Sequence, residues 1–260
     1  MVSTIPINMT DKQKKSQEID VVTIRFAGDS GDGMQLTGNQ FTTNSALFGN
    51  DISTLPDFPA EIRAPAGSLA GVSSFQLQFS SLDIHTPGDK LDVLIAMNPA
   101  ALKVNLSDLK THGMLIVNTA NYSAKNLKLA GYENNPLEDE SLNDYKLIKV
   151  DMTNLVFTAL EDLDLSSKAK SRSTNMFALG LLYWLYERSL DSTLKFLESK
   201  FKNKPEIVDA NVKALKAGYF YGETVEAIKT TFKVSEATLD KGIYRNIMGN
   251  ESLSLGLIAA

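Results

Sequence analysis

The chain has 260 residues, a net charge of −5 and a pI near 5.2. This length can bury a full core in one domain of about 200 residues plus extensions, and the acidic balance excludes a general nucleic-acid binder, which needs a basic face. The absence of cysteine excludes disulfides and Cys-ligated iron–sulfur clusters. The two histidines, His85 and His112, lack the spacing of zinc ligands, so we predict no metal site.

The first 19 residues are polar, and we expect a flexible tail over residues 1–19 rather than a signal peptide. No apolar run approaches the roughly 18 residues that a membrane-spanning helix needs. We therefore expect no membrane segment and a cytoplasmic location.

Strand periodicity begins at Val21 and continues to Phe26, where a glycine-rich turn leads into a helix over 34–48 that Gly49 ends. Alternating or continuous apolar runs predict further strands over residues 51–55, 72–79, 92–97, 114–117 and 147–150. Because strands and helices alternate along the chain, we predict an α/β fold with a parallel or mixed sheet and helices on both faces.

Asn98-Pro99 is a helix-start signal, and a helix is expected from Pro99 to about Lys110. Residues 119–146 are polar and indicate an insertion with little core. Further helices are expected over residues 173–185, 191–202 and 206–228, and the first of them has almost no polar face, which predicts burial. The apolar run 252–260 predicts a C-terminal helix whose continuation is missing from the chain.

The glycine-rich turn is the first candidate site. Gly28, Gly31 and Gly33 allow a sharp bend and a close approach of a ligand. The helix that follows directs free N–H groups and a positive dipole end at the turn, which favours a phosphate or carboxylate. Arg63 suits bidentate anion binding, and Asn98 closes a strand where open α/β sheets place ligands. The candidate contacts are Gly28, Ser30, Gly31, Gly33, Glu61, Arg63 and Asn98.

Other interpretations of these motifs stay open. The spacing Gly-x-x-Gly-x-Gly differs from the dinucleotide fingerprint, so the turn is also compatible with a purely structural connection. Arg63 is equally compatible with a surface pair to Glu61. Lys168, Lys170 and Arg172 are basic, and a solvated loop explains them at least as well as an anion site. A serine hydrolase is disfavoured, because no histidine precedes Ser30 or follows His112.

Several motifs together resemble one family. They are the glycine turn 28–33, Asp-Phe-Pro-Ala-Glu-Ile-Arg-Ala-Pro-Ala-Gly over 57–67, Asp-Ile-His-Thr-Pro-Gly-Asp over 83–89, Ala-Met-Asn-Pro-Ala-Ala-Leu over 96–102 and Gly-Ile-Tyr-Arg-Asn-Ile-Met-Gly-Asn-Glu over 242–251. The chain resembles, over roughly residues 20–260, the gamma-type domain at the N-terminus of the alpha subunit of 2-oxoacid:ferredoxin oxidoreductases. Within that family it is most similar to the 2-oxoglutarate branch.

The resemblance implies a Rossmann-like three-layer sandwich with a mostly parallel sheet, plus a C-terminal helical extension. Its domains would be the tail 1–19, a gamma-type domain 20–232, and a segment 233–260 that links to and begins a truncated thiamine-enzyme pyrimidine-type domain. The family oxidatively decarboxylates a 2-oxoacid with coenzyme A to acyl-CoA, CO2 and reduced ferredoxin. The resemblance implies as partners a thiamine-binding beta subunit, ferredoxin and the rest of the alpha subunit in a hetero-oligomer.

The family's thiamine diphosphate and iron–sulfur residues have no counterpart here, so the isolated chain is expected to be inactive and to carry no catalytic residue. Its expected role is to assist coenzyme A access and subunit assembly. Two alternatives remain at this point: a structural docking domain without a ligand, and an independent nucleotide-binding protein.

Overall fold

The computed structural model describes residues 15–61, 64–225 and 227–260. The strands are β1 (Lys15–Glu18), β2 (Val21–Asp29), β3 (Asp51–Asp57), β4 (Val72–Ser80), β5 (Leu91–Ala96), β6 (Leu109–Asn118), β7 (Lys146–Val150) and β8 (Thr230–Lys233). The helices are α1 (Met34–Phe48), α2 (Pro99–Asn105), α3 (Ala124–Leu129), α4 (Met152–Ala159), α5 (Ser167–Ser171), α6 (Thr174–Leu185), α7 (Asp191–Lys200), α8 (Pro205–Thr224) and α9 (Gly249–Ala259).

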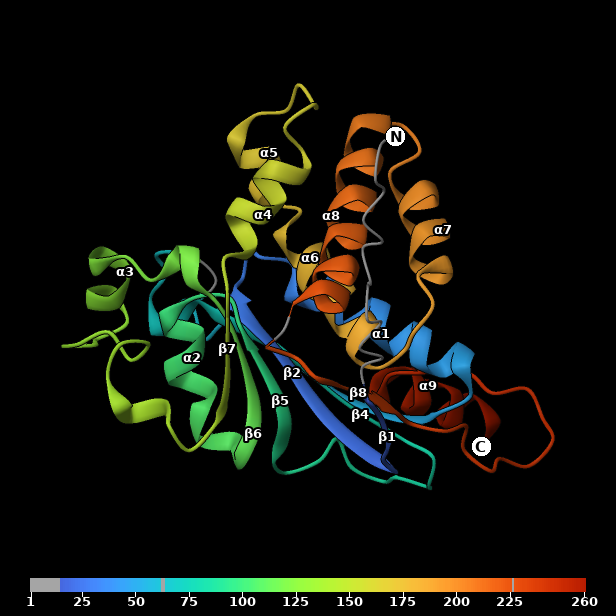
Figure 1. Cartoon of the computed structure of the whole chain (residues 1–260). Helices are drawn as coiled ribbons and strands as arrows, with labels where there is room; N and C mark the ends of the chain where they lie inside the picture. Colours follow the sequence, from blue (N-terminus) through green and yellow to red (C-terminus); the bar gives the residue numbers. More distant parts are fainter. Residues whose placement is uncertain (1–14, 62–63, 226) are drawn as a thin grey trace, which may run out of the picture.

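The central sheet has six strands in the order β3-β4-β2-β5-β6-β7. Strands β2, β5, β6 and β7 are parallel, and β4 runs antiparallel to both β2 and β3. Helices α1, α4, α6 and α8 cover one face, and α2 and α3 lie on the other (Figure 1). The predicted three-layer α/β fold with a mostly parallel sheet is therefore confirmed.

The alternation of side chains along β2 builds both cores. Val22, Ile24 and Phe26 are fully buried under α1 and α6, whereas Ala27 packs in the second core against α2. Since helix α1 follows β2 on one face and α2 follows β5 on the other, the strand connections diverge between β2 and β5. Open α/β sheets bind ligands at such a point, outside the carboxyl ends of the strands.

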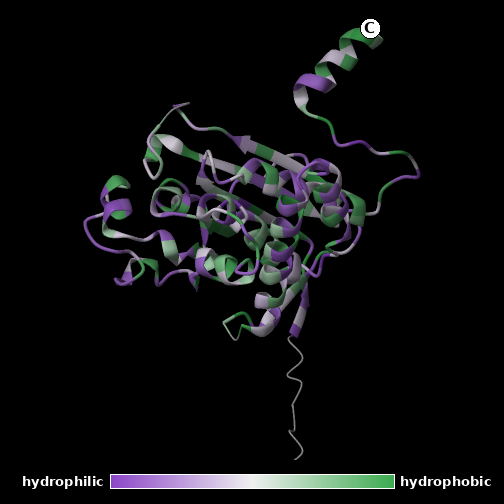
Figure 2. Ribbon diagram, turned by 90° about the horizontal axis from the view of Figure 1, so that it is seen from above, coloured by the Kyte–Doolittle hydropathy of each residue, from purple (hydrophilic) through white to green (hydrophobic). Residues whose placement is uncertain are grey.

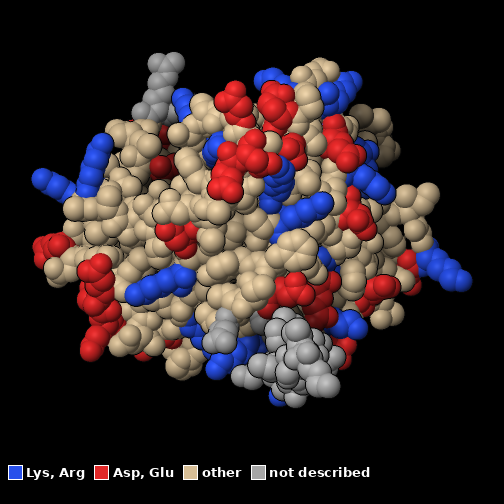
Figure 3. Space-filling view, turned by 45° about the horizontal axis from the view of Figure 1, so that its top comes forward, with Lys and Arg blue, Asp and Glu red and all other residues tan. Residues whose placement is uncertain are grey.

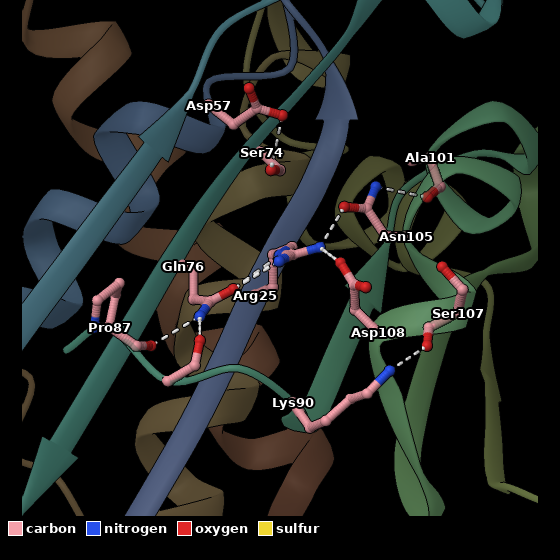
Figure 4. Close-up of polar contacts among 11 residues, drawn as sticks. Arg25, Asp57, Ser74, Gln76, Pro87, Lys90, Ala101, Asn105, Ser107 and Asp108 are labelled. Atoms are coloured by element: carbon pink, nitrogen blue, oxygen red, sulfur yellow. Dashed lines mark hydrogen bonds and ion pairs between the residues drawn. The ribbon is translucent and has the colours of Figure 1, made fainter.

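Arg25 on β2 ties the second face together (Figure 4). Its guanidinium donates to Gln76 Oε1 at 2.6 and 3.1 Å, to Asn105 Oδ1 at 2.9 Å and to Asp108 Oδ2 at 2.6 Å. The Gln76 amide in turn donates to the carbonyl oxygens of Pro87 and Gly88 at 2.6 Å. This network holds the 87–88 turn and the end of α2 against the sheet. Because every donor in it has a partner, we interpret the network as structural rather than as a ligand site.

The best-predicted element is α1, which runs from Met34 to Phe48 as expected. Gly33 (φ 76°) and Gly49 (φ 94°) bracket it, both in the left-handed region that favours glycine. The start of α2 is also confirmed, because Asn98 Oδ1 accepts from the Ala101 N–H at 2.8 Å and Pro99 follows as the first helical residue.

Four expectations were wrong in part. The helix expected over 99–110 ends at Asn105, and Leu109 and Lys110 belong to β6, because Leu109 pairs with Leu91 of β5. The helix expected to 228 ends at Thr224. Residues 15–18 are not a tail but pair in parallel with β8; the rest of that expected tail lies outside the described residues. The insertion contains α3 and buries Ala130, Leu137 and Leu142.

Helix α9 is present where a C-terminal helix was expected, and it stands away from the body (Figure 2). It has no buried residue, and its apolar side chains are exposed, among them Leu257 and Ile258. Val234 is buried in the main core, one residue past β8. The predicted boundary between residues 232 and 233 remains a proposal.

On the face shown in Figure 3, acidic and basic side chains are intermingled rather than segregated. Among the described residues, no helix combines the length and the apolar character needed to cross a bilayer.

Candidate functional site

The glycine-rich turn connects the end of β2 at Asp29 to the start of α1 at Met34. Gly33 is the residue before the helix, and a Cβ there would overlap the Asn175 side chain. A Cβ on Gly28 would lie 2.8 Å from Asp32 Oδ2. Gly33 therefore requires glycine for its φ and its contact, and space at Gly28 is tight.

Three backbone N–H groups of the turn are hydrogen-bonded within the chain. The Asp29 N–H donates to Asp32 Oδ2 at 2.9 Å, and the Asp32 N–H donates to the Asp29 carbonyl at 2.9 Å. The Ser30 N–H donates to the Gly71 carbonyl at 3.2 Å. These three amides are therefore not free for an anionic ligand, and an anion contact at the rest of the turn remains a prediction. Gly31 differs, because the space where its Cβ would stand is open.

Two carboxyl groups also lie at the turn. Burial raises the pKa of Asp32 to about 6, although the Asp29 N–H opposes the shift. Burial likewise raises the pKa of Asp29, against the hydrogen bonds from Gly67 and Asn98. Asp29 Oδ2 accepts from the Gly67 N–H at 2.9 Å. This side of the site is rich in acceptors and disfavours an anion.

A cavity of about 400 Å³ lies beside the turn, at the carboxyl ends of β2 and β5. Its lining residues are Asp29, Ser30, Gly31, Asp32, Ala64, Ala66, Gly71, Met97, Lys168, Ser171, Arg172, Thr174 and Asn175. The wall opposite the turn is formed by α5 and the first residues of α6. It brings two cations, Lys168 and Arg172, to the positive end of the α6 dipole.

The first two residues of α6 carry buried polar atoms without partners. Thr174 and Asn175 are each 5% exposed, and Thr174 Oγ1 and Asn175 Oδ1 make no hydrogen bond. Most buried polar groups in folded proteins are paired, and leaving one unpaired costs about 1–3 kcal/mol. Both atoms have almost no accessible surface, so they are not part of the accessible lining of the cavity.

The structure brings only some of the predicted contacts to this cavity. Ser30 and Gly31 line it, and Gly28 and Gly33 support the turn behind them. Asn98 is buried, and its amide oxygen caps α2. Glu61 is exposed, and Arg63 lies outside the described residues. As ligand contacts, all seven candidates remain predictions.

Sequence reasoning missed the acidic pair and helix α5, although it did offer Lys168, Lys170 and Arg172 as either an anion site or a solvated loop. Asp29 and Asp32 occupy the variable positions of the glycine pattern, where no side chain is expected to matter. The segment from Ser166 to Lys170 contains a helix-start signal that could have predicted α5. The Ser166 hydroxyl caps that helix by accepting a hydrogen bond from the Ala169 N–H at 3.3 Å. Among the described residues, no cluster of three His, Cys, Asp or Glu side chains is placed to hold a metal ion.

A mostly parallel sheet with a glycine turn after its first long strand, and a cavity at the diverging strand ends, defines a Rossmann-like domain. Residues 23–221 match the family of pyruvate ferredoxin/flavodoxin oxidoreductases, and the chain belongs to this family. The family expected from the motifs is thereby confirmed.

The relatives are informative about the branch. The chain is 55% identical, over 94% of its length, to the 2-oxoglutarate oxidoreductase subunit KorA of Mycobacterium tuberculosis, of which it covers 37%. It is similar to the 2-oxoglutarate:ferredoxin oxidoreductase of Magnetococcus marinus, solved with 2-oxoglutarate, coenzyme A and succinyl-CoA (TM-score 0.64, 25% identity, 85% of this chain and 34% of that one). The chain thus spans little more than a third of the length of these two relatives.

A third relative has the size of a single domain. Pyruvate oxidoreductase subunit PORC of Thermotoga maritima matches 78% of this chain and 97% of its own with a TM-score of 0.52 and 20% identity. That likeness shows the fold, and it shows that this fold also occurs as a separate subunit.

The raised pKa of Asp32 makes a stability prediction. Because the folded-state pKa of about 6 exceeds the ordinary 3.8, the folded chain binds this proton more tightly than the unfolded chain does. The contribution of Asp32 to stability should be fully present below pH 4 and lost as the pH rises through 6. Asp32→Asn keeps an acceptor for the Asp29 N–H, so we expect it to raise the free energy of unfolding at pH 7.5 by about 2–3 kcal/mol.

Urea unfolding at pH 5, 6 and 7.5 measures the effect. The variant should lose less stability between pH 5 and 7.5 than the wild-type chain. Asp164→Asn, which removes an exposed carboxylate elsewhere, serves as the matched control and should leave the pH profile unchanged. Parallel profiles for wild type and Asp32→Asn would show that Asp32 is not the group that titrates.

Proposed function

We propose that this chain is the gamma-type domain of the alpha subunit of a 2-oxoglutarate:ferredoxin oxidoreductase. The complex would decarboxylate the oxoacid oxidatively with coenzyme A, giving succinyl-CoA, CO2 and reduced ferredoxin in the cytoplasm. The observation that carries the proposal is the 55% identity to a 2-oxoglutarate oxidoreductase subunit over 94% of the chain. Identity at that level, extending across the whole domain, favours the 2-oxoglutarate branch over pyruvate.

The chain's own chemistry supports a noncatalytic role within that complex. It has no cysteine for an iron–sulfur cluster, and none of its described residues form a cluster suited to a metal. We therefore assign thiamine diphosphate and the iron–sulfur cluster to other parts of the assembly. The proposed partners are the thiamine-binding beta subunit, ferredoxin and the remaining part of the alpha subunit, in a hetero-oligomer.

The cavity supports a part in coenzyme A access. It lies at the strand ends where α/β domains bind ligands, and the wall formed by α5 and the start of α6 carries Lys168 and Arg172. The Magnetococcus marinus relative was solved with coenzyme A, so the substrate class of that branch carries phosphate groups. A phosphate-bearing substrate and a cavity with a cationic wall agree in charge.

The test is reconstitution. The complete alpha subunit with its beta subunit should reduce ferredoxin when given 2-oxoglutarate and coenzyme A, and should do so faster than with pyruvate. The isolated 260-residue chain should show no turnover and no absorbance from a bound flavin or nicotinamide. Turnover by the isolated chain, or a preference for pyruvate in the complex, would overturn this assignment.

One observation favours the docking alternative. The turn amides of Asp29, Ser30 and Asp32 are already paired within the chain. If calorimetry on the assembled complex shows coenzyme A binding that neither Gly31→Val nor Arg63→Ala alters, these turn and loop positions contribute only to assembly.

A further inference from the structure

We propose that a second cavity, at the amino ends of the parallel strands, binds a small organic acid that carries one carboxylate and a short apolar body. This cavity lies at the opposite edge of the sheet from the cavity beside the glycine turn. The inference therefore goes beyond the proposed function and does not depend on it.

The first residues of all four parallel strands form the cavity. Its volume is about 260 Å³, and Val21 of β2, Asp92 of β5, Lys110 of β6 and Lys146 of β7 line it. Each of these residues is the first or second of its strand, which places the cavity at the amino edge of the sheet. Phe232 of β8 contributes a further wall.

An irregularity in β6 brings polar groups to this cavity. Asp92 of β5 stands alone opposite residues 110–113 of β6, where the pairing of the two strands shifts, and all four of these residues line the cavity. His112 has a φ of 62°, which is uncommon for a residue other than glycine. Its N–H donates to the Asp144 carbonyl at 2.7 Å. Bulges and left-handed residues of this kind cluster at functional sites, where they re-aim side chains.

Tyr186 supplies a buried hydroxyl without a partner. This residue follows α6 directly, lines the cavity and is 3% exposed, and its hydroxyl makes no hydrogen bond to any described residue. It is also not one of the unpaired polar atoms that are sealed from solvent. Burial raises the pKa of Tyr186 and the charge of Asp92 raises it further, so the hydroxyl keeps its proton. It can donate that proton to a ligand acceptor.

The charges around the cavity favour an anion as that acceptor. Asp92 is the carboxylate among the described lining residues, and both of its oxygens are occupied: Oδ1 accepts from Lys110 Nζ at 2.6 Å and Oδ2 from the Thr23 N–H at 2.8 Å. Lys146 forms no ion pair within the part of the chain that the structure describes. A ligand carboxylate can pair with Lys146 and accept from the Tyr186 hydroxyl.

The remaining surface calls for an apolar body on the ligand. A neighbouring cavity of about 350 Å³ shares Met114, Lys146 and Phe232 with the first, and Ile148 and Ile228 line it as well. A hydrocarbon group attached to a carboxylate at Lys146 would find apolar surface in either cavity, and its burial would favour binding. A ligand with several charges would leave most of them without partners here.

Isothermal titration calorimetry with sodium hexanoate tests this proposal, on the 260-residue chain and on the assembled complex. We expect saturable binding of one hexanoate per chain in both. Hexanamide has the same shape without the charge, and should bind at least tenfold more weakly. Acetate has the charge without the apolar body, and should also bind at least tenfold more weakly.

Two variants assign the contacts. Tyr186→Phe removes only the hydroxyl, and should weaken hexanoate binding about tenfold. Lys146→Ala removes the unpaired cation, and should weaken it about fivefold. Lys195→Ala is the matched control, because Lys195 is an exposed lysine of α7 that lines neither cavity. It should bind as wild type, and all three variants should keep the urea midpoint of the wild type.

The outcomes decide the proposal without reference to oxoacid turnover. No saturable binding of hexanoate at about 10 mM, equal binding of hexanoate and hexanamide, or unchanged affinity in both variants would each overturn it. Binding to the chain that disappears in the assembled complex would assign the cavity to an acidic side chain of a partner subunit, and would overturn a free organic acid as its ligand. Because no turnover is measured, these results leave the proposed function to its own test.

Discussion

Gly218→Ala is expected to unfold the chain or to destabilise it by about 4 kcal/mol or more. A Cβ at Gly218 would overlap the backbone carbonyl of Phe177 on α6, and a Cβ at Gly180 would overlap the carbonyl of Leu215 on α8. The two helices thus touch backbone to backbone at two reciprocal points. Neither contact can be relieved by turning a side chain, so the helices must separate.

The sign of this effect follows from comparing two terms. Replacing glycine by alanine inside a helix gains about 1 kcal/mol in helix propensity. Overpacking a well-filled core costs about 1–3 kcal/mol when side chains can adjust, and more when backbone must move. Every residue of α6 is buried, so moving it disturbs the whole core on that face of the sheet.

Gly256→Ala is the matched control for the glycine prediction. It makes the same chemical change within helix α9, where a new Cβ meets nothing within 4 Å. Urea unfolding followed by circular dichroism should give a midpoint close to that of the wild type. A Gly218→Ala chain as stable as wild type would mean that α6 and α8 do not pack as closely as described.

The glycine pair illustrates what the sequence could and could not predict. An apolar run without a polar face was enough to predict that α6 is buried. The α8 partner was also expected as a helix, starting at Pro205. Which glycines meet across the interface depends on how the helices cross, and no local pattern encodes that angle.

The same distinction explains the errors in the elements. Bounds set by local chemistry were predicted well, as for α1 between two left-handed glycines. Bounds set by distant partners were not: Leu109 joins β6 because Leu91 is beside it, and Lys15 joins a strand because Thr230 is. Helix α4 was not anticipated, although Asp151 caps it through the Asn154 N–H.

For the candidate site, the sequence indicated the strand end beside which the cavity lies but not the charged groups that surround it. The end of the first long strand is indeed at the diverging point of the sheet, beside a cavity. The turn amides are hydrogen-bonded to Asp32 and to the Gly71 carbonyl. The second contact forms only when a loop from far along the chain folds back onto the turn. For the same reason Lys168 and Arg172 could not be separated from a solvated loop until α5 and α6 were placed.

Phe41→Ala should produce the second large loss of stability, about 3–5 kcal/mol. Phe41 on α1 is fully buried, and its ring centroid lies 5.4 Å from that of Phe79, 5.5 Å from Tyr183, 6.0 Å from Tyr186 and 6.3 Å from Phe26. The truncation removes one ring from a cluster that joins α1, α6 and the sheet. The loss combines transfer of the ring, the cavity left behind and the aromatic pair contacts.

Phe41→Leu and Phe58→Ala test whether the cluster is the cause. Leucine fills part of the space, so Phe41→Leu should cost clearly less than the alanine variant. Phe58 is 67% exposed, and its truncation should change the free energy of unfolding by no more than about 0.5 kcal/mol. If urea unfolding gives similar losses of stability for Phe41→Ala and Phe58→Ala, the ring of Phe41 is not packed between α1, α6 and the sheet.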